Sequence, residues 1–309
     1  MLSRIAESLY WIGRYLERAE VTARLLEVHV QTLLEDPVTD EGTATGNLLS
    51  VLGVETEDDA DLSHDILVQT LGWDAGSPAS MVSAFWGARE SARRSREVVS
   101  AELWEAINTT WNMVRNNRLQ RQRIADACHL IRERCATITG LVDATMTHDQ
   151  GWQFLVLGRS LERIDMTARI IESAMFMPNE EAAWLHSLRA CNAYHAFRLT
   201  HKGSESPTDA AEFLLLDRMF PRSVVFCLDQ SEGIVSRLEP GVGIAQLDEL
   251  MKVLGAARAD LEYRPRRLLL DGVRGRMKSL QKTCIEVNEA VAARYFDAAD
   301  TLTWQAGVR

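Results

Sequence analysis

Apolar residues recur at helical spacing along almost the whole chain, and no stretch alternates apolar and polar residues in the manner of a half-buried strand. Six of the seven prolines lie where such an apolar stretch begins or ends, which is typical of a helical protein. The pattern therefore predicts an all-α fold, a multi-helix bundle. Its long helices are expected at about residues 3–35, 80–99, 100–117, 120–147, 151–177, 179–200, 221–238, 243–262 and 268–300.

Two segments interrupt the helical pattern. Residues 36–80 contain glycines, a proline and an acidic run, which predicts a looped excursion with one or two short helices, and residues 200–207 form a second loop. Ser77-Pro78 and Ser206-Pro207 each have the pattern of an N-cap followed by proline at the first helical position, and Phe220-Pro221 is expected to open another helix.

The chain contains an internal repeat. Residues 9–27 align with residues 154–172 at a constant offset of 145, with nine identities in nineteen positions. Such self-similarity predicts two pseudo-repeated helical halves, each contributing one equivalent helix.

Each repeat carries a stripe of alternating arginines and carboxylates beside its apolar face, because residues three and four positions apart share one side of a helix. The stripes comprise Arg14, Glu17, Glu20 and Arg24 in the first repeat and Arg159, Glu162, Asp165 and Arg169 in the second. Gly13 and Gly158 lie on the same arc, although glycine inside a helix costs about 1 kcal/mol relative to alanine. We therefore expect another helix or a ligand to approach the backbone at both glycines.

Two interpretations of these Arg–Glu stripes remain open at this stage. Glu20 with Arg24, and Asp165 with Arg169, form i,i+4 pairs that suit a structural salt-bridge network. Alternatively, arginine binds carboxylate and glutamate binds ammonium, so the stripes suit a zwitterionic amino acid or peptide. A water-filled cleft at both stripes would favour binding, whereas stripes sealed against each other would favour a structural role.

In the binding interpretation, Glu17 and Glu162 orient the substrate amine or accept its proton as the catalytic carboxylates. The remaining substrate-binding residues are Arg14, Arg18, Glu20, Arg24, Arg159, Arg163, Asp165 and Arg169. A di-iron carboxylate site is disfavoured because neither repeat has histidine three residues after its acid, and no metal ligand set is expected.

Four segments of the chain strongly resemble the bacterial alpha-E family, an all-helical domain named for a Glu-Arg motif. They are Ser3–Glu20, Ala88–Arg93, Glu102–Asn108 and Glu212–Ser223. The motif maps onto Glu17-Arg18 and, through the repeat, onto Glu162-Arg163. The resemblance implies a single helical domain over residues 1–309.

The resemblance also implies partners. Proteins of this kind typically stand beside, or are fused to, a circularly permuted ATP-grasp protein, often near a transglutaminase-like protein. The implied setting is ATP-dependent amide-bond formation on an amino acid or small peptide, with ATP and Mg²⁺ used by the partner. No catalytic assignment comes with the family. The chain itself has neither a P-loop nor a Rossmann glycine motif, so no cofactor of its own is expected.

Composition narrows the remaining function classes. The formal net charge of −10 opposes broad binding to nucleic acid or to an anionic membrane. Met1 is followed directly by amphipathic sequence with no signal-like apolar segment, and no apolar run could span a bilayer, so a cytoplasmic protein with reduced cysteines is expected. Local basic clusters occur at Arg89/Arg93/Arg94/Arg96, at Arg115/Arg118/Arg121/Arg123, and at Arg264/Arg266/Arg267 with Arg274 and Arg276.

Two functional hypotheses follow. In the first, the stripes form a polar groove that holds the substrate of an ATP-grasp-dependent amide-forming system. In the second, the chain is a non-catalytic scaffold that docks the ATP-grasp ligase, and both stripes are structural. Most arginines of the first two basic clusters are expected simply to be solvated, whereas the third is a candidate contact for phosphate or an acidic partner.

Overall fold

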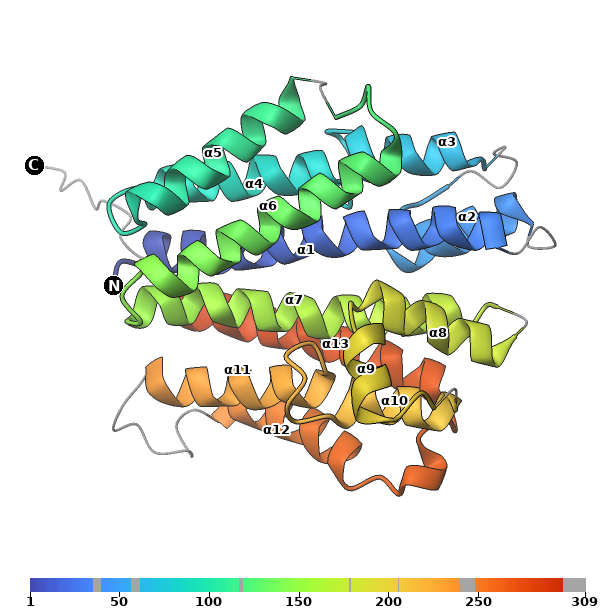
Figure 1. Ribbon diagram of the computed structural model, residues 1–309. Coiled ribbons are helices and arrows are strands. Elements are labelled where there is room, and N and C mark those ends of the chain that lie inside the picture. Colours follow the sequence, from blue (N-terminus) through green and yellow to red (C-terminus); the bar gives the residue numbers. More distant parts are fainter. Residues whose placement is uncertain are drawn as a thin grey trace, which may run out of the picture.

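A computed structural model describes residues 1–35, 40–56, 62–116, 119–177, 179–204, 206–238 and 248–296. Every regular element within these ranges is a helix, which confirms the all-α prediction (Figure 1). The longest are α1 (Ser3–Glu35), α7 (Gln150–Ala174) and α6 (Ile124–Thr145). No helix in the described part of the chain is long and apolar enough to span a membrane.

Helices α1 and α7 lie side by side at the centre of the molecule (Figure 1). On one side, α4 (Met81–Arg94) and α6 pack against α1, and α5 (Ala101–Arg115) covers them. On the other side, α11 (Val224–Leu238) and α13 (Val273–Val291) pack against α7, and α12 (Asp248–Glu262) lies outside them. The two helices that carry the Arg–Glu stripes are therefore the central pair.

Short helices close one end of this arrangement. The segment predicted as a looped excursion contains α2 (Glu41–Val51), α3 (His64–Leu67) and the π-helical turn η1 (Val68–Trp73), while residues 36–39 and 57–61 lie outside the described part. After α7 come α8 (Glu180–Ala190), α9 (Tyr194–Thr200) and α10 (Pro207–Leu216); η3 (Arg266–Leu268) precedes α13, and η4 (Ala292–Phe296) follows it.

Side-chain caps explain where several helices begin. Ser206 accepts a hydrogen bond from the Asp209 amide and Pro207 follows it at the first helical position, as predicted. The predicted start at Ser77-Pro78 is wrong, because the cap of α4 is Ser80, whose hydroxyl accepts from the Ser83 amide at 3.1 Å. The start expected at Phe220-Pro221 is displaced by a few residues, to Val224.

The helix predicted over 179–200 is two helices, and the reason is a Schellman motif. Asn192 has φ 54° in the left-handed region, and the Ala193 amide donates to the Leu188 carbonyl at 2.7 Å, which ends α8. Gly272, with φ 63°, likewise delays α13 to Val273, five residues after the predicted start. The predicted residues 117, 243–247 and 297–300 lie outside the described part of the chain.

Candidate functional site

The two stripe helices touch through their backbones. A methyl group added at Gly13 would lie 2.0 Å from the Leu155 carbonyl oxygen, and one added at Gly158 would lie 2.0 Å from the Tyr10 carbonyl oxygen. Real side-chain carbons do not approach so closely, so only glycine fits at either position. The close approach expected at both glycines is therefore that of another helix, and the contact is reciprocal between α1 and α7.

Glu162 of α7 is held by two arginines of α1. Its Oε2 accepts from Arg14 Nε at 2.6 Å, and its Oε1 accepts from Arg18 Nε at 2.6 Å. The residue is 0% exposed. Burial alone would raise the pKa of this carboxyl, but the charges of Arg18 and Arg14 outweigh it and lower the pKa to about 2.

Glu17 of α1 mirrors Glu162 across the helix pair. One of its oxygens accepts from Arg163 Nε of α7 at 2.9 Å, and the other accepts from Arg222, which precedes α11. Arg222 also bridges to Glu20 at 2.7 Å, and Glu20 in turn accepts from Arg24 at 2.8 Å. Although burial opposes its charge, Glu17 and Glu20 raise the pKa of Arg222.

The other stripe residues of α7 pair away from α1. Asp165 accepts from Arg169 Nε within the same helix at 2.9 Å, and burial together with nearby Glu162 raises the pKa of Asp165. Arg159 lies 3.7 Å from the partly exposed Asp143 of α6, and its buried Nε has no hydrogen-bond partner among the described residues.

The predicted stripe residues thus lie in neighbouring ion pairs, most of them buried, which also include Arg222 and Asp143; we call this set of pairs the ion-pair network. Seven arginines of the described chain meet five carboxylates in these pairs. Both oxygens of Glu17 and both oxygens of Glu162 already accept arginine hydrogen bonds. Arg222 was not predicted, although it stands inside the Phe-Pro-Arg-Ser segment that carries part of the family resemblance.

A small cavity opens beside this network. It has a volume of about 180 Å³, and we call it the stripe pocket. It is lined by Arg18, Thr22, Leu52, Pro78, Ala79, Glu162, Asp165, Met166 and Arg169. The side chains of Arg18 and Arg169 are each 23% exposed, so both guanidinium groups reach water from the edge of the network.

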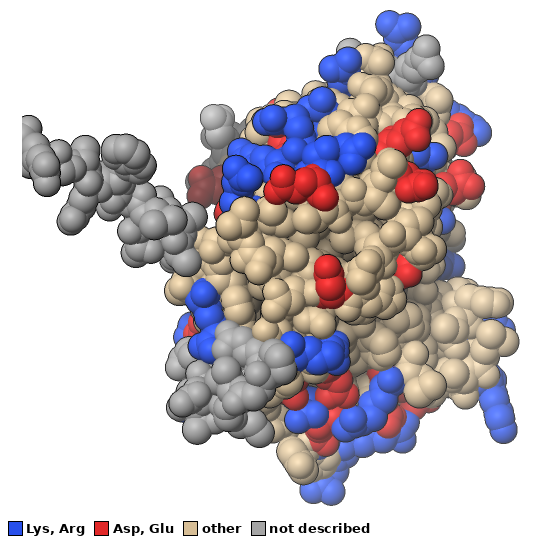
Figure 2. Space-filling model, turned by 90° about the vertical axis from the view of Figure 1, so that its left-hand side faces the viewer, with Lys and Arg blue, Asp and Glu red and all other residues tan. Residues whose placement is uncertain are grey.

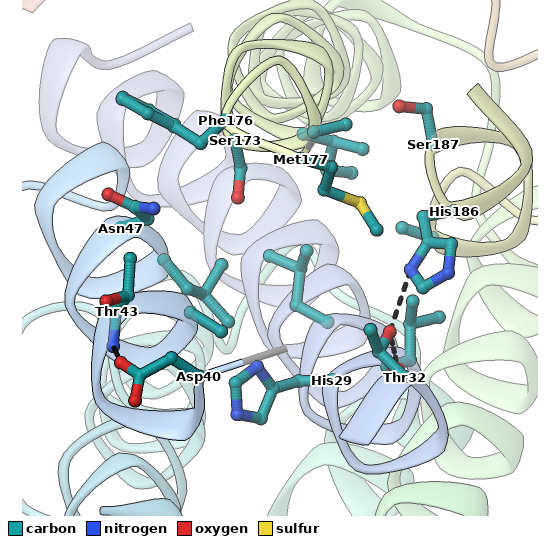
Figure 3. Close-up of a pocket in the computed structure, with 17 residues that line it drawn as sticks. His29, Thr32, Asp40, Thr43, Asn47, Ser173, Phe176, Met177, His186 and Ser187 are labelled. Atoms are coloured by element: carbon teal, nitrogen blue, oxygen red, sulfur yellow. Dashed lines mark hydrogen bonds between the residues drawn. The ribbon is translucent and has the colours of Figure 1, made fainter. Parts of the chain in front are cut away.

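A second pocket, of about 290 Å³, lies between α1, α2, α7 and α8 (Figure 3). We call it the His pocket, because His29 and His186 both line it. Pattern analysis missed this pocket because its walls come from four separate helices. No group of metal-binding residues occurs in the described part of the chain.

Most of the third basic cluster is paired. Arg264 bonds to Asp260 at 2.9 Å, Arg266 bonds to Glu212 at 2.6 Å, and Arg276 donates to the Leu269 carbonyl at 2.8 Å. These arginines tie α10, α12 and the turn before α13 together. In the second cluster, Arg123 pairs with Asp126, and Arg118 lies outside the described residues.

The first basic cluster lies on α4 and at the start of the following turn. Arg89 bonds to Asn108 of α5 at 3.1 Å, and Arg93 pairs with Glu90 at 2.9 Å. Figure 2 shows Lys and Arg side chains gathered in the upper part of the view, at the end of the molecule where α4 ends and α5 begins.

Comparison with known proteins gives a family but no characterised relative. Residues 1–296 match the family Alpha-E, described as a predicted alpha-helical domain with a conserved ER motif. The chain is 26% identical, over 97% of its length, to the uncharacterized protein Mb2597 of Mycobacterium bovis and to the uncharacterized protein Rv2567 of Mycobacterium tuberculosis. It spans 36% of the length of each of these proteins. No solved structure matches it.

The family match covers nearly all of the chain, including both Arg–Glu stripes and the Arg222 segment. The Glu-Arg pairs in this chain, Glu17-Arg18 and Glu162-Arg163, lie at the contact between α1 and α7. The chain belongs to the alpha-E family.

Proposed function

We propose that this chain is a non-catalytic helical scaffold that docks the ligase of an ATP-grasp-dependent amide-forming system, and that its stripes are structural. One observation carries the proposal: Glu17 and Glu162, the two carboxylates at the contact between α1 and α7, are buried and held by arginines. Glu162 has no exposed surface, and two arginines occupy its oxygens. A carboxylate held in this way is a poor general base, because its proton affinity is low and arginine hydrogen bonds already occupy both of its oxygens.

The length of the relatives supports a docking role. Because the chain spans 36% of Rv2567, that relative joins an alpha-E region to a longer polypeptide. The family resemblance implies an ATP-grasp protein as the natural companion. A helical unit that works with such a companion needs a surface that holds it.

The surface best suited to this role is the Trp–Arg face, which we define as Trp86, Arg89 and Arg93 of α4 with Trp104 and Trp111 of α5. Trp86 is 55% exposed, and the guanidinium of Arg89 lies 5.9 Å from the Trp104 ring centroid. Tryptophan and arginine are the residues that most often dominate binding energy at protein interfaces. Glu90 of α4 pairs with both Arg89 and Arg93, and the second arginine leaves a net positive charge, which favours an acidic surface on the ligase.

The docking proposal is tested by calorimetry between the purified chain and the ATP-grasp protein of the same organism. We expect Trp86→Ala with Arg93→Glu to weaken binding at least tenfold, because an aromatic anchor and a complementary charge are both lost. Arg123→Glu is the matched control, since the side chain of this arginine is 85% exposed and pairs with Asp126 of the same helix turn. Equal binding by all of these proteins would exclude the Trp–Arg face.

A second candidate function is amino-acid or peptide binding in the stripe pocket, and the observation that favours it is the pairing of charges there. Arg18 and Arg169 offer partly exposed guanidinium groups for a carboxylate, while Asp165 lines the same cavity and offers an acceptor for an ammonium group. In this version the stripes both join the helices and bind the substrate of the partner ligase.

Calorimetric titration with amino acids and dipeptides separates the two candidates. If the stripe pocket binds a zwitterion, Arg169→Met abolishes the heat of binding, whereas Arg24→Met, which changes the network away from this cavity, preserves it. If no amino acid or dipeptide binds the unaltered chain, the docking proposal stands alone. Assaying the reconstituted ligase with ATP, Mg²⁺ and the Arg169→Met chain then tests whether amide formation needs this arginine.

A further inference from the structure

The His pocket is separate from both surfaces discussed above. Its lining residues come from α1, α2, α7, the turn after α7, and α8, and none of them belongs to the ion-pair network or to the Trp–Arg face. They are Leu25, Val28, His29, Thr32, Asp40, Thr43, Ala44, Asn47, Leu48, Ile170, Ser173, Ala174, Phe176, Met177, His186, Ser187 and Ala190. Its volume of about 290 Å³ is close to the lower end of the range for small-molecule sites, about 300–1,000 Å³.

The walls of the pocket are mainly apolar. Val28 of α1, Leu48 of α2 and Ile170 of α7 contribute branched aliphatic side chains, and Met177 extends into the space between α7 and α8 (Figure 3). A methionine thioether adapts its shape to different occupants. These walls suit the apolar body of a small molecule.

One side of the pocket has polar groups that the protein does not use. The Asn47 amide and the Ser173 hydroxyl make no hydrogen bond to the described residues, although each lines the pocket. Figure 3 shows Asn47 of α2 and Ser173 of α7 on one side of the pocket, with the amide nitrogen of Asn47 on the side nearer to Ser173. Together they present the amide N–H donors of Asn47 and the hydroxyl of Ser173 to anything between them.

On the opposite side of the pocket, hydrogen bonds within the protein already orient Thr32 and His186. Thr32 donates its hydroxyl proton to the Val28 carbonyl at 2.8 Å, so the 2.7 Å contact with His186 Nδ1 requires the ring N–H to donate to Thr32. Burial and the nearby His64 lower the pKa of His29 to about 4, so this ring is neutral at neutral pH. Neither histidine needs a metal ion to explain its position.

Among the described residues, no charged side chain points into the pocket to pair with an ionic ligand. No lysine or arginine is among its described lining residues, and Asp40 is its one carboxylate there. Asp40 accepts from the Thr43 amide at 2.8 Å as the N-cap of α2, and Figure 3 shows its oxygens turned to that amide and away from the pocket. An unpaired charge moved from water into such surroundings is strongly disfavoured.

We propose that the His pocket binds a small uncharged molecule, with an apolar body against Val28, Ile170 and Met177 and one amide or hydroxyl group between Asn47 and Ser173. This site is independent of the docking surface and of the stripe pocket. The ligand class follows from the apolar walls, the two unused polar side chains and the lack of a facing charge.

The test uses three probes with one ring and different charge: benzamide, benzoate and benzylammonium. The full chain is labelled with ¹³C at its methionine methyl groups, so that Met177 reports occupancy of the pocket by NMR. We expect benzamide to shift the Met177 signal in a saturable manner, with a dissociation constant on the order of millimolar for so small a ligand. Benzoate and benzylammonium are expected to bind at least tenfold more weakly.

Two variants locate the probe. Ala44→Trp fills the pocket and is expected to abolish the benzamide shift, whereas Ala125→Trp, on an exposed position of α6, leaves it unchanged. Asn47→Leu keeps the volume but removes the amide, and we expect at least a fivefold loss of benzamide affinity. An unchanged Met177 signal with benzamide, equal affinity for benzoate, or full binding by Asn47→Leu would each overturn the proposal.

Discussion

At the scale of single residues, the fold lowers the pKa of a buried carboxylate, that of Glu162. Glu162 is buried between Arg14 and Arg18, and its pKa of about 2 lies below the ordinary value of 4.5. A buried ion pair contributes little net stability, because desolvation offsets the attraction, but removing one partner leaves the other charge unpaired. We therefore expect a substitution in a stripe to be strongly destabilising, because it leaves the partner charge buried and unpaired.

We expect Glu162→Gln to lower the free energy of unfolding by about 3–5 kcal/mol, because two buried guanidinium groups lose their carboxylate. Urea denaturation followed by circular dichroism measures this change. Glu133→Gln is the control, since the Glu133 side chain is 62% exposed and lies 4.0 Å from its partner His129, and it is expected to change stability by less than about 0.5 kcal/mol. A similar small change at Glu162 would contradict the structural role of the stripes.

The same carboxylate predicts acid sensitivity. Because the folded pKa of Glu162 is lower than its unfolded pKa, its contribution to stability is complete above about pH 5 and is lost as the pH falls from there toward 2. Urea midpoints measured between pH 7 and pH 3 are therefore expected to decrease toward low pH, and the decrease is expected to be smaller in Glu162→Gln. An identical pH dependence in the two proteins would show that other groups cause it.

At the scale of helices, the contact between α1 and α7 is determined by glycine. Gly13 and Gly158 let the two backbones meet, and the arginines of each helix then reach carboxylates of the other. These ion pairs favour one register of α1 against α7, because a shift of one helical turn would move the arginines away from their carboxylates. The internal repeat matches this reciprocal contact, and duplication of two complete halves stays a prediction.

Alanine substitutions test this contact. Alanine favours a helix over glycine by about 1 kcal/mol, and Gly140→Ala in α6, where a methyl group meets no atom within 4 Å, is expected to stabilise the protein by up to that amount. Gly13→Ala and Gly158→Ala are expected to destabilise it by about 1–3 kcal/mol or more, because the added methyl would overlap a carbonyl oxygen of the facing helix. Thermal unfolding of the three variants measures the difference in sign.

At the scale of the whole molecule, α1 and α7 connect two sets of helices that hardly touch each other otherwise. Arg222 strengthens this connection, since it reaches from the turn before α11 to Glu17 and Glu20 of α1. Thiols from both sets are buried along the central pair, among them Cys135 of α6 and Cys227 of α11. We therefore expect both sets to unfold together.

Thiol labelling tests that cooperativity. All five cysteines are free and buried, and burial raises the pKa of Cys128, Cys191 and Cys227 to about 12. With an aromatic disulfide reagent at pH 8, we expect no rapid reaction from the folded protein and five equivalents after unfolding in urea. The urea dependence of labelling is expected to match that of circular dichroism, and early labelling of one or two thiols would reveal partial unfolding.

Periodicity alone predicts the helices of this protein well, because the apolar face of a helix is a local property of the chain. The predicted range 3–35 coincides with α1, while Asn192 and Gly272 moved other boundaries through backbone conformations that apolar spacing does not encode. The glycines and stripes also indicated a close contact from sequence. Which atoms meet there depends on how distant segments pack: Arg222 joins Glu17 from 205 residues away. Likewise, the His pocket exists only because four helices converge, and no local pattern records such a cavity.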